Sequence, residues 1–123
     1  MSHQSVVQAA RAFLDLYTDV FNTFDAARIS DLYHAPCVTV RGDGSVHCFS
    51  SRDEIANFFQ RVAEGYAKEG MHVGAYRNFD AVPIGGRSAL ATVDWDMLRA
   101  DRSVIRHWRQ SYNLIETAQG WRI

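Results

Sequence analysis

The sequence predicts an α+β fold in which helices come early in the chain and an antiparallel sheet comes late. Apolar residues recur at helical spacing over the first quarter of the chain and again between residues 51 and 70. After Gly70 the spacing changes to alternation, which two short turns divide into three long strands. Helices grouped ahead of an antiparallel sheet are typical of one α+β domain, here spanning residues 1–123.

The helical part divides into three segments. Residues 5–24 carry a single apolar stripe, and Asp25 suits the N-cap of a shorter helix over residues 26–33. The third helix opens on Ser51-Arg52-Asp53-Glu54, in which the serine and the glutamate can each bond the other's free backbone N–H. Gly70 is a suitable stop for it.

Turn positions predict which strand residues stand opposite each other. The expected strands are residues 37–41 and 46–49 in a hairpin, then about 71–82, 87–99 and 104–116, and a last short strand at 121–123. A two-residue turn at residues 101–102 brings Trp95 opposite Trp108, and one at residues 85–86 brings Tyr76 opposite Trp95. A bulge at Pro83 would shift the second register by one.

These registers predict two different faces of the long sheet. One carries the aromatic row Tyr76, Trp95 and Trp108 with polar neighbours Asn78 and Gln110, and the other carries the row Arg77, Asp94 and Arg109. Opposite charges on neighbouring strands contribute roughly 0.2–1 kcal/mol per pair. Such pairing is the ordinary explanation of Asp94 and Asp96, and an acid–base pair is the alternative. Because polar residues lie among the rings, we interpret the aromatic face as the wall of a ligand pocket rather than plain core.

Composition and charge set limits on partners. The chain has 123 residues and a formal net charge of -1 with no block of like charges, so we expect neither a nucleic-acid nor a membrane partner. The start of the sequence lacks the layout of a secretion signal, so a cytoplasmic location is the default. Cys37 and Cys48 are expected to be diagonal neighbours in their hairpin and to stay reduced. No metal-ligand spacing and no cofactor-binding motif is present, so we expect no metal and no cofactor.

The sequence resembles the nuclear transport factor 2-like superfamily over nearly its whole length. The residues that carry the resemblance are Tyr17-Thr-Asp-Val-Phe-Asn-Thr-Phe-Asp25 leading to Leu32-Tyr33, and Ser111-Tyr112-Asn113-Leu114 followed by Gly120-Trp121-Arg122-Ile123. The superfamily includes ketosteroid isomerase, SnoaL-type polyketide cyclases, scytalone dehydratase and limonene epoxide hydrolase. The resemblance implies a cone-shaped, curved antiparallel sheet with three helices on its concave face, enclosing a pocket.

The resemblance does not carry the isomerase chemistry over to this chain. Ketosteroid isomerase relies on a tyrosine, a carboxylate base and a protonated aspartic acid. Tyr17 matches the tyrosine, but the base falls at Arg41, or at Val40 with a shifted strand, and the acid falls near Gln110. An arginine cannot remove a proton near neutral pH. Two of the three roles are therefore missing.

We expect a SnoaL-like protein that binds a small apolar or aromatic molecule, and a cofactor-free isomerase, lyase or hydrolase acting on that molecule is the enzymatic form of this hypothesis. The predicted ligand-binding residues are Tyr17, Arg41, Phe58, Tyr76, Asn78, Trp95, Trp108, Gln110 and Tyr112. The candidates for catalysis are Tyr17 as a hydrogen-bond donor and Asp80 as a general base, each with a structural alternative.

A second hypothesis is a non-catalytic dimerisation or carrier module whose pocket is filled by side chains. Pocket volume separates the two, because a small-molecule site needs roughly 300 Å³ or more of open space. We also expect a homodimer formed through the outer face of the sheet, which carries Arg77, Asp94, Asp96, His107 and Arg109.

Overall fold

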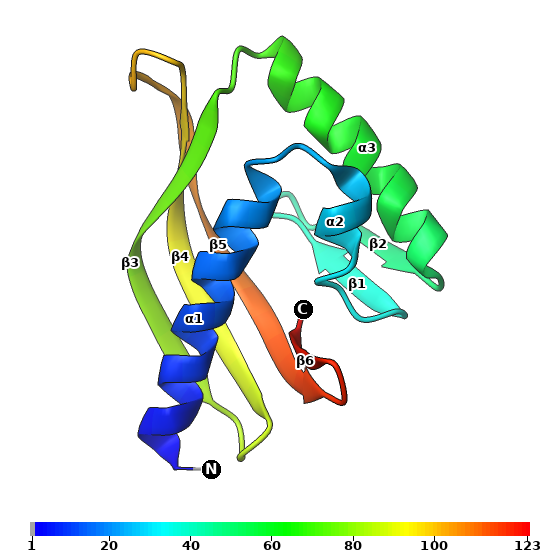
Figure 1. Ribbon diagram of the computed structural model, residues 1–123, viewed down its shortest axis with the longest axis vertical. Coiled ribbons are helices and arrows are strands. Elements are labelled where there is room, and N and C mark those ends of the chain that lie inside the picture. The colour runs from blue at the N-terminus through cyan, green and yellow to red at the C-terminus, as the bar shows by residue number, and fades with distance from the viewer. Residues whose placement is uncertain (1) are drawn as a thin grey trace.

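The computed structural model describes residues 2–123 and has the predicted order of elements (Figure 1). The helices are α1 (His3–Phe21), α2 (Ala26–Ser30) and α3 (Arg52–Lys68), and the strands are β1 (Cys37–Val40), β2 (Val46–Phe49), β3 (Val73–Pro83), β4 (Ser88–Leu98), β5 (Val104–Thr117) and β6 (Gly120–Arg122). The α+β prediction is confirmed. The first two helices end three residues before their predicted ends.

The predicted starts of α2 and α3 are confirmed by their capping bonds. The Asp25 carboxylate accepts the backbone N–H of Ala27 at 3.1 Å, and the Ser51 hydroxyl accepts that of Glu54 at 3.2 Å. The predicted return bond differs by one residue. The Glu54 carboxylate accepts the backbone N–H of Ser50, at 2.8 Å, instead of that of Ser51. α2 and α3 therefore begin where the sequence indicates, whereas α1 begins at His3, two residues before its predicted start.

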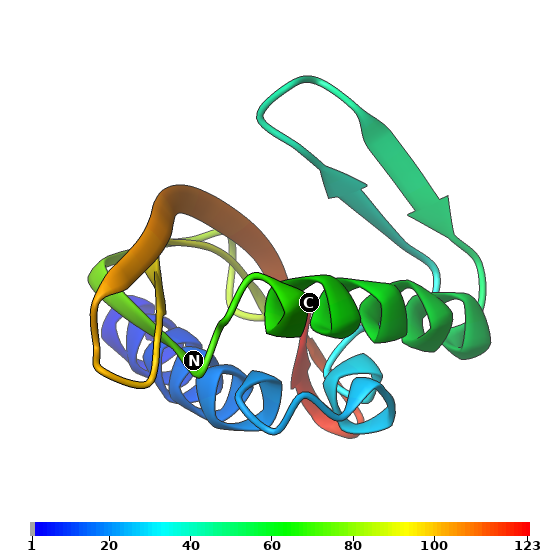
Figure 2. The same ribbon diagram turned by 90° about the horizontal axis from the view of Figure 1, so that it is seen from above.

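The strands form two antiparallel sheets of different size. β3, β4, β5 and β6 form a curved, four-stranded sheet in that order, and β1 pairs only with β2. α1 lies along the concave face of the long sheet, where Leu14 and Tyr17 join Val93 and Trp95 in the buried core (Figure 1). The β1–β2 hairpin projects away from the long sheet, as the view from above shows (Figure 2).

The centre of the long sheet has the predicted register. Trp95 stands opposite both Trp108 and Tyr76, and Asp94 stands opposite both Arg109 and Arg77. The turns themselves are one residue longer than predicted. Backbone N–H groups of Arg99 and Ile84 donate to the carbonyls four residues further on, each at 2.9 Å, so each loop has three residues. One irregularity in each ladder absorbs the extra residue.

The irregularity in β3 lies between Arg77 and Asp80 rather than at Pro83. Asn78 takes a left-handed φ of 55° there, a conformation that asparagine tolerates better than most residues. Beyond the bulge, Asp80 stands opposite Thr92. The register shift therefore turns Asn78 and Asp80 away from the face that carries Trp95.

The short hairpin has a register one residue away from the predicted one. Cys37 stands opposite Phe49, and Val38 stands opposite Cys48. Gly44, with a φ of 87°, closes a three-residue loop between Arg41 and Ser45, whose backbone groups bond at 2.9 Å. Cys37 and Cys48 therefore point to opposite sides of the hairpin and are not the diagonal neighbours that were predicted. Both are free thiols, as expected.

Candidate functional site

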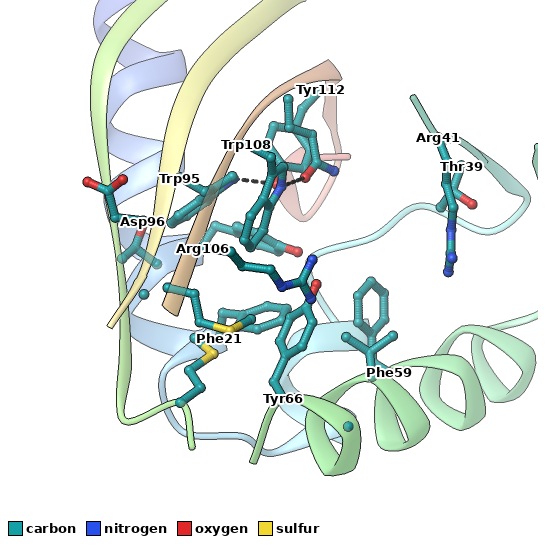
Figure 3. A pocket seen from close by; sticks show the side chains of 18 of the residues that line it. Phe21, Thr39, Arg41, Phe59, Tyr66, Trp95, Asp96, Arg106, Trp108 and Tyr112 are labelled. Carbon is teal, nitrogen blue, oxygen red and sulfur yellow. Dashed lines mark hydrogen bonds between the residues drawn. The ribbon is translucent and has the colours of Figure 1, made fainter. Parts of the chain in front are cut away.

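A cavity of about 880 Å³ opens between the concave face of the sheet, α1, α3 and the inner side of the β1–β2 hairpin. Figure 3 shows Trp108 and Arg106 on the sheet side and Thr39 and Arg41 on the hairpin side. Seven predicted ligand-binding residues line this cavity: Tyr17, Arg41, Phe58, Trp95, Trp108, Gln110 and Tyr112. Whether they bind a ligand stays a prediction.

The buried end of the cavity holds a cluster of hydroxyl groups. The hydroxyls of Tyr17 on α1 and Tyr33 after α2 lie 2.6 Å apart and share a hydrogen bond. The indole N–H of Trp95 donates to the Tyr112 hydroxyl at 2.8 Å. The Tyr17 and Tyr112 ring centroids are 5.6 Å apart. Tyr17, Trp95 and Tyr112 are all less than 10% exposed, so these bonds form away from bulk water.

Two of the three hydroxyl protons in this tyrosine cluster are not used in the hydrogen bonds of residues 2–123. One hydroxyl of the Tyr17–Tyr33 pair donates to the other, which leaves one proton uncommitted, and the Tyr112 hydroxyl only accepts within the bonds of residues 2–123. Burial is the largest cause that raises the pKa of Tyr17, Tyr33 and Tyr112 well above the usual value. The hydroxyls therefore stay protonated near neutral pH and offer hydrogen-bond donors to an oxygen in the cavity.

Arg106 joins the sheet to the end of α3 on one side of the mouth. Its guanidinium donates two hydrogen bonds, each 3.2 Å long, to the carboxylate of Glu69. The same group lies 5.3 Å from the ring centroid of Tyr66 and 5.1 Å from that of Trp108. The Trp108 indole N–H donates to the Gln110 side-chain oxygen at 2.9 Å. Polar groups on this wall are therefore largely paired with one another.

The hairpin side of the mouth is less completely paired. The Thr39 hydroxyl is buried and, among the described residues, has no hydrogen-bond partner. Arg41, two residues further along, has its guanidinium 5.9 Å from the ring centroid of Phe58. Side chains two positions apart on a strand share a face, so Thr39 and Arg41 both turn toward the cavity. Both residues line it.

Tyr76 is not in the cavity, contrary to the prediction. Its ring packs on Trp95 with a centroid distance of 6.0 Å, as the register predicts. Its hydroxyl, however, donates a hydrogen bond to the Asp15 carboxylate on the exposed side of α1. Burial, together with this hydrogen bond, raises the pKa of Tyr76 to about 12. α1 covers this part of the aromatic row and separates Tyr76 from the space beside Trp108.

Asn78 and Asp80 are also outside the cavity, because of the bulge in β3. The Asn78 amide donates to the Asp94 carboxylate at 2.8 Å, on the outer face of the sheet. Asp80 is exposed and stands opposite Thr92 on that same face. The predicted role of Asp80 as a general base inside the pocket is therefore not supported by its position.

The outer face is organised by ion pairs. Asp94 accepts from Arg109 at 3.0 Å and contacts Arg77 at 3.5 Å, and Asp96 accepts from Arg77 at 3.1 Å. Hydrogen bonds from Asn78 and Arg109 are the main causes that lower the pKa of Asp94. This geometry fits the interpretation of Asp94 and Asp96 as ladder ion pairs. Asp94 does not line the cavity, and Asp96, which borders it, is paired with Arg77.

Sequence reasoning missed Tyr33, Glu69 and Arg106 as parts of the site. Alternation along β5 puts Arg106 on the same face as Trp108, so that signal was available in the sequence. Tyr33 and Glu69 follow the ends of helices, and their approach to the cavity depends on tertiary packing. No cluster of three or more metal-ligating side chains occurs among residues 2–123.

Comparisons with known proteins agree with the fold. A protein from Novosphingobium aromaticivorans, named for an inferred aromatic ring hydroxylase activity, has a TM-score of 0.72 at 17% identity, covering 99% of this chain and 86% of that chain. An NTF2-like protein with a cystatin-like fold from the same species has a TM-score of 0.67 at 15% identity, with 94% and 75% covered. The protein Aln2 from a Streptomyces species has a TM-score of 0.70 at 10% identity, with 99% and 88% covered.

The remaining comparisons concern sequence. No curated protein matches the chain. Within the described residues, no helix combines the length and apolar character needed to cross a membrane. The family described as NTF2-like protein (DUF6841) matches residues 7–123. Since this match spans nearly the whole sequence, the chain belongs to that NTF2-like family, as its resemblance to the superfamily implied.

Proposed function

We propose that this protein binds a small, flat and mostly apolar molecule that carries a hydrogen-bond-accepting oxygen, as a SnoaL-like binding domain. The observation that carries the proposal is the tyrosine cluster of Tyr17, Tyr33 and Tyr112, which offers uncommitted hydroxyl protons at the buried end of the cavity. Aromatic walls with a few placed polar groups suit such a ligand. Trp95 and Trp108 supply flat surfaces on which it can stack.

The alternative, a module whose pocket is filled by side chains, is less well supported. Its discriminating feature is a cavity below roughly 300 Å³. The cavity has a volume of about 880 Å³. Trp95, Trp108 and Phe58 line that space rather than closing it.

Ligand binding is supported better than catalysis by the groups that line the cavity. Tyrosine donors would stabilise negative charge on a ligand oxygen, which is one contribution that an isomerase, lyase or hydrolase needs. Removal of a proton needs a base as well. Among the described lining residues the carboxylates are those of Glu69 and Asp96, and both are paired with arginines. The donor half of such a reaction is therefore better supported than the base.

The test is a hydroxyl deletion with a matched control. Binding of 2-acetonaphthone and of naphthalene is followed by quenching of tryptophan fluorescence and by calorimetry. We expect Tyr33→Phe to weaken 2-acetonaphthone binding by about 3- to 10-fold, the usual range for one lost neutral hydrogen bond. Naphthalene has no oxygen, so its affinity should not change.

Tyr76→Phe is the control, because it removes a hydroxyl from the same aromatic row but outside the cavity. It should leave the affinity for both compounds unchanged. Absence of binding by either compound would count against the proposal. Equal effects of Tyr33→Phe and Tyr76→Phe would do so as well.

We further propose that two copies associate through the outer face of the long sheet. Partly exposed carboxylates and exposed guanidinium groups alternate there, in Arg77, Asp94, Asp96 and Arg109. A two-fold axis would bring such groups of opposite charge across from one another. The expected interface is polar, and the cavity on the concave side would stay accessible in the dimer.

A further inference from the structure

The charges around the cavity do not balance. Six charged residues line it: Arg41, Arg61, Glu69, Asp96, Arg106 and Arg109. Glu69 is paired with Arg106, while Asp96 and Arg109 are paired on the outer face with Arg77 and Asp94. Within residues 2–123, Arg41 and Arg61 form no ion pair and no side-chain hydrogen bond. The hydrogen bond from the Ser45 backbone N–H and, to a smaller extent, the charge of Arg41 lower the pKa of Asp43 in the hairpin loop, so this carboxylate partly offsets the charge of Arg41 without forming an ion pair with it. The mouth of the cavity therefore carries guanidinium charge that no ion pair neutralises.

Arg41 is the better placed of these two cations. It follows Thr39 on the inner side of the hairpin, and Figure 3 shows it across the cavity from Trp108 and Arg106. The charge of Arg41 also affects a residue that lines the cavity. Burial raises the pKa of Tyr66, and the guanidinium groups of Arg106 and Arg41 oppose that rise. The Arg41 charge therefore acts on the interior of the mouth as well as on bulk solvent.

A second polar group near Arg41 also lacks a partner. The buried Thr39 hydroxyl has no hydrogen-bond partner among the described residues, although buried polar groups are normally paired. An anionic group lying beside Arg41 would accept from the guanidinium and from this hydroxyl together. Glu69 does not compete for that position, since its two oxygens are bonded to Arg106 on the opposite wall.

We propose that the ligand of this cavity is an aromatic carboxylate whose charged group binds Arg41, with Thr39 as a second donor. This inference rests on the proposed binding function and specifies its ligand class. The guanidinium fork matches the two oxygens of a carboxylate, and charged hydrogen bonds of that kind are stronger than neutral ones. The aromatic body lies against Trp108 and Phe58, and a carboxylate at the mouth keeps part of its hydration.

The test compares two probes that differ in charge but hardly in shape, 2-naphthoate and 2-naphthamide. Calorimetry is done at about pH 8, where 2-naphthoate is fully ionised and 2-naphthamide is neutral. We expect the wild-type protein to bind the carboxylate about 5- to 10-fold more tightly than the amide, because charged hydrogen bonds exceed neutral ones. Arg41→Gln should abolish this preference and leave the affinity for 2-naphthamide unchanged. Arg41→Lys should keep part of it, since the charge remains but the fork is lost.

Arg28→Gln is the matched control. Arg28 is exposed on α2 and does not line the cavity, so the same change of charge there should leave the preference intact. Equal binding of both probes to the wild-type protein would overturn the carboxylate inference while leaving the binding function standing. A preference that survives Arg41→Gln, or that Arg61→Gln removes instead, would overturn the assignment to Arg41. Absence of binding by both probes would overturn both proposals.

Discussion

Successive residues of β4 point to opposite sides of the sheet, and the two sides are stabilised by different forces. On the inner side Val93, Trp95 and Met97 are buried, and they pack against helices or line the cavity. On the outer side Asp94 and Asp96 are only partly covered and bond to arginines of the neighbouring strands. Burial of apolar area stabilises the first side, while the ion pairs of the second contribute little because water screens them.

The same division separates the proposed binding surface from the proposed dimer interface. The inner side presents rings and tyrosine hydroxyls to a cavity, and the outer side presents alternating charges to solvent. Because the side-chain period of a strand is two residues, a shift of one residue exchanges these surroundings. The bulge at Asn78 makes that exchange within β3. A polar residue on a strand of this sheet can therefore be assigned to a site only after its face is known.

The largest effect expected from this comparison is on the inner face. Trp95→Ala removes a buried ring that contacts Tyr17 and Tyr76, and we expect it to lower the free energy of unfolding by about 3–5 kcal/mol. The substitution also removes the indole N–H that donates a hydrogen bond to the Tyr112 hydroxyl. Urea denaturation measures the change. A loss below about 1 kcal/mol would contradict the assignment of Trp95 to the packed core.

A smaller effect is expected one residue away, on the outer face. Asp94→Asn removes a carboxylate whose partners are all exposed, so the unfolding midpoint should move far less than for Trp95→Ala. The folded-state pKa of Asp94 is lowered, so its stabilisation is present above the unfolded-state pKa and is lost as the pH falls through the folded value.

Thermal melts of the wild-type protein and Asp94→Asn should therefore differ at neutral pH and converge in acid. Equal differences at both pH values would show that the charge of Asp94 is not the cause. A shift as large as that of Trp95→Ala would remove the contrast between the two faces.

The smallest effect expected is association through the outer face. A polar interface without an apolar centre gives a weak dimer, so multi-angle light scattering should report a mass that rises with concentration toward twice 13.9 kDa. Raised salt should lower it, because screening weakens the charge pairs. A constant mass of one chain at micromolar concentration would contradict the proposal. His107 lies on the same face, so His107→Glu should change the mass at a given concentration without altering the fold.

The sequence predicts the strand register correctly only for residues that lie beyond both a loop and the irregularity that compensates for its extra residue. The central pairs Trp95–Trp108 and Asp94–Arg109 were predictable, because two errors cancel: each loop has one more residue than expected, and an irregularity compensates for it. In the β3–β4 ladder the compensating bulge lies between Arg77 and Asp80, several residues away from the loop. The predicted register is therefore wrong from the loop to the bulge, and Asn78 was assigned to the wrong face. Alternation alone does not reveal where a bulge lies.

The candidate site was partly predictable for a related reason. Residues on strands, such as Trp108 and Gln110, follow from period and register. Tyr33 depends instead on how α2 packs on α1, which brings its hydroxyl 2.6 Å from that of Tyr17. Tyr76 was assigned correctly to its face, but the sequence does not indicate that α1 covers that end of the row. Packing between elements decides these cases, and local patterns do not encode it.

The projection of the β1–β2 hairpin has a consequence for how this protein can change over evolutionary time. Arg41 belongs to the loop end of the hairpin, and its neighbour Val40 is 72% exposed. Substitutions there cost the fold little. Tyr17 and Trp95, by contrast, serve the core and the cavity at once, so most of their replacements are lost to selection through unfolding. For the proposed binding function, this means that sequence change at the mouth can alter ligand preference without unfolding the protein. Libraries that test this should be concentrated on residues 39–42.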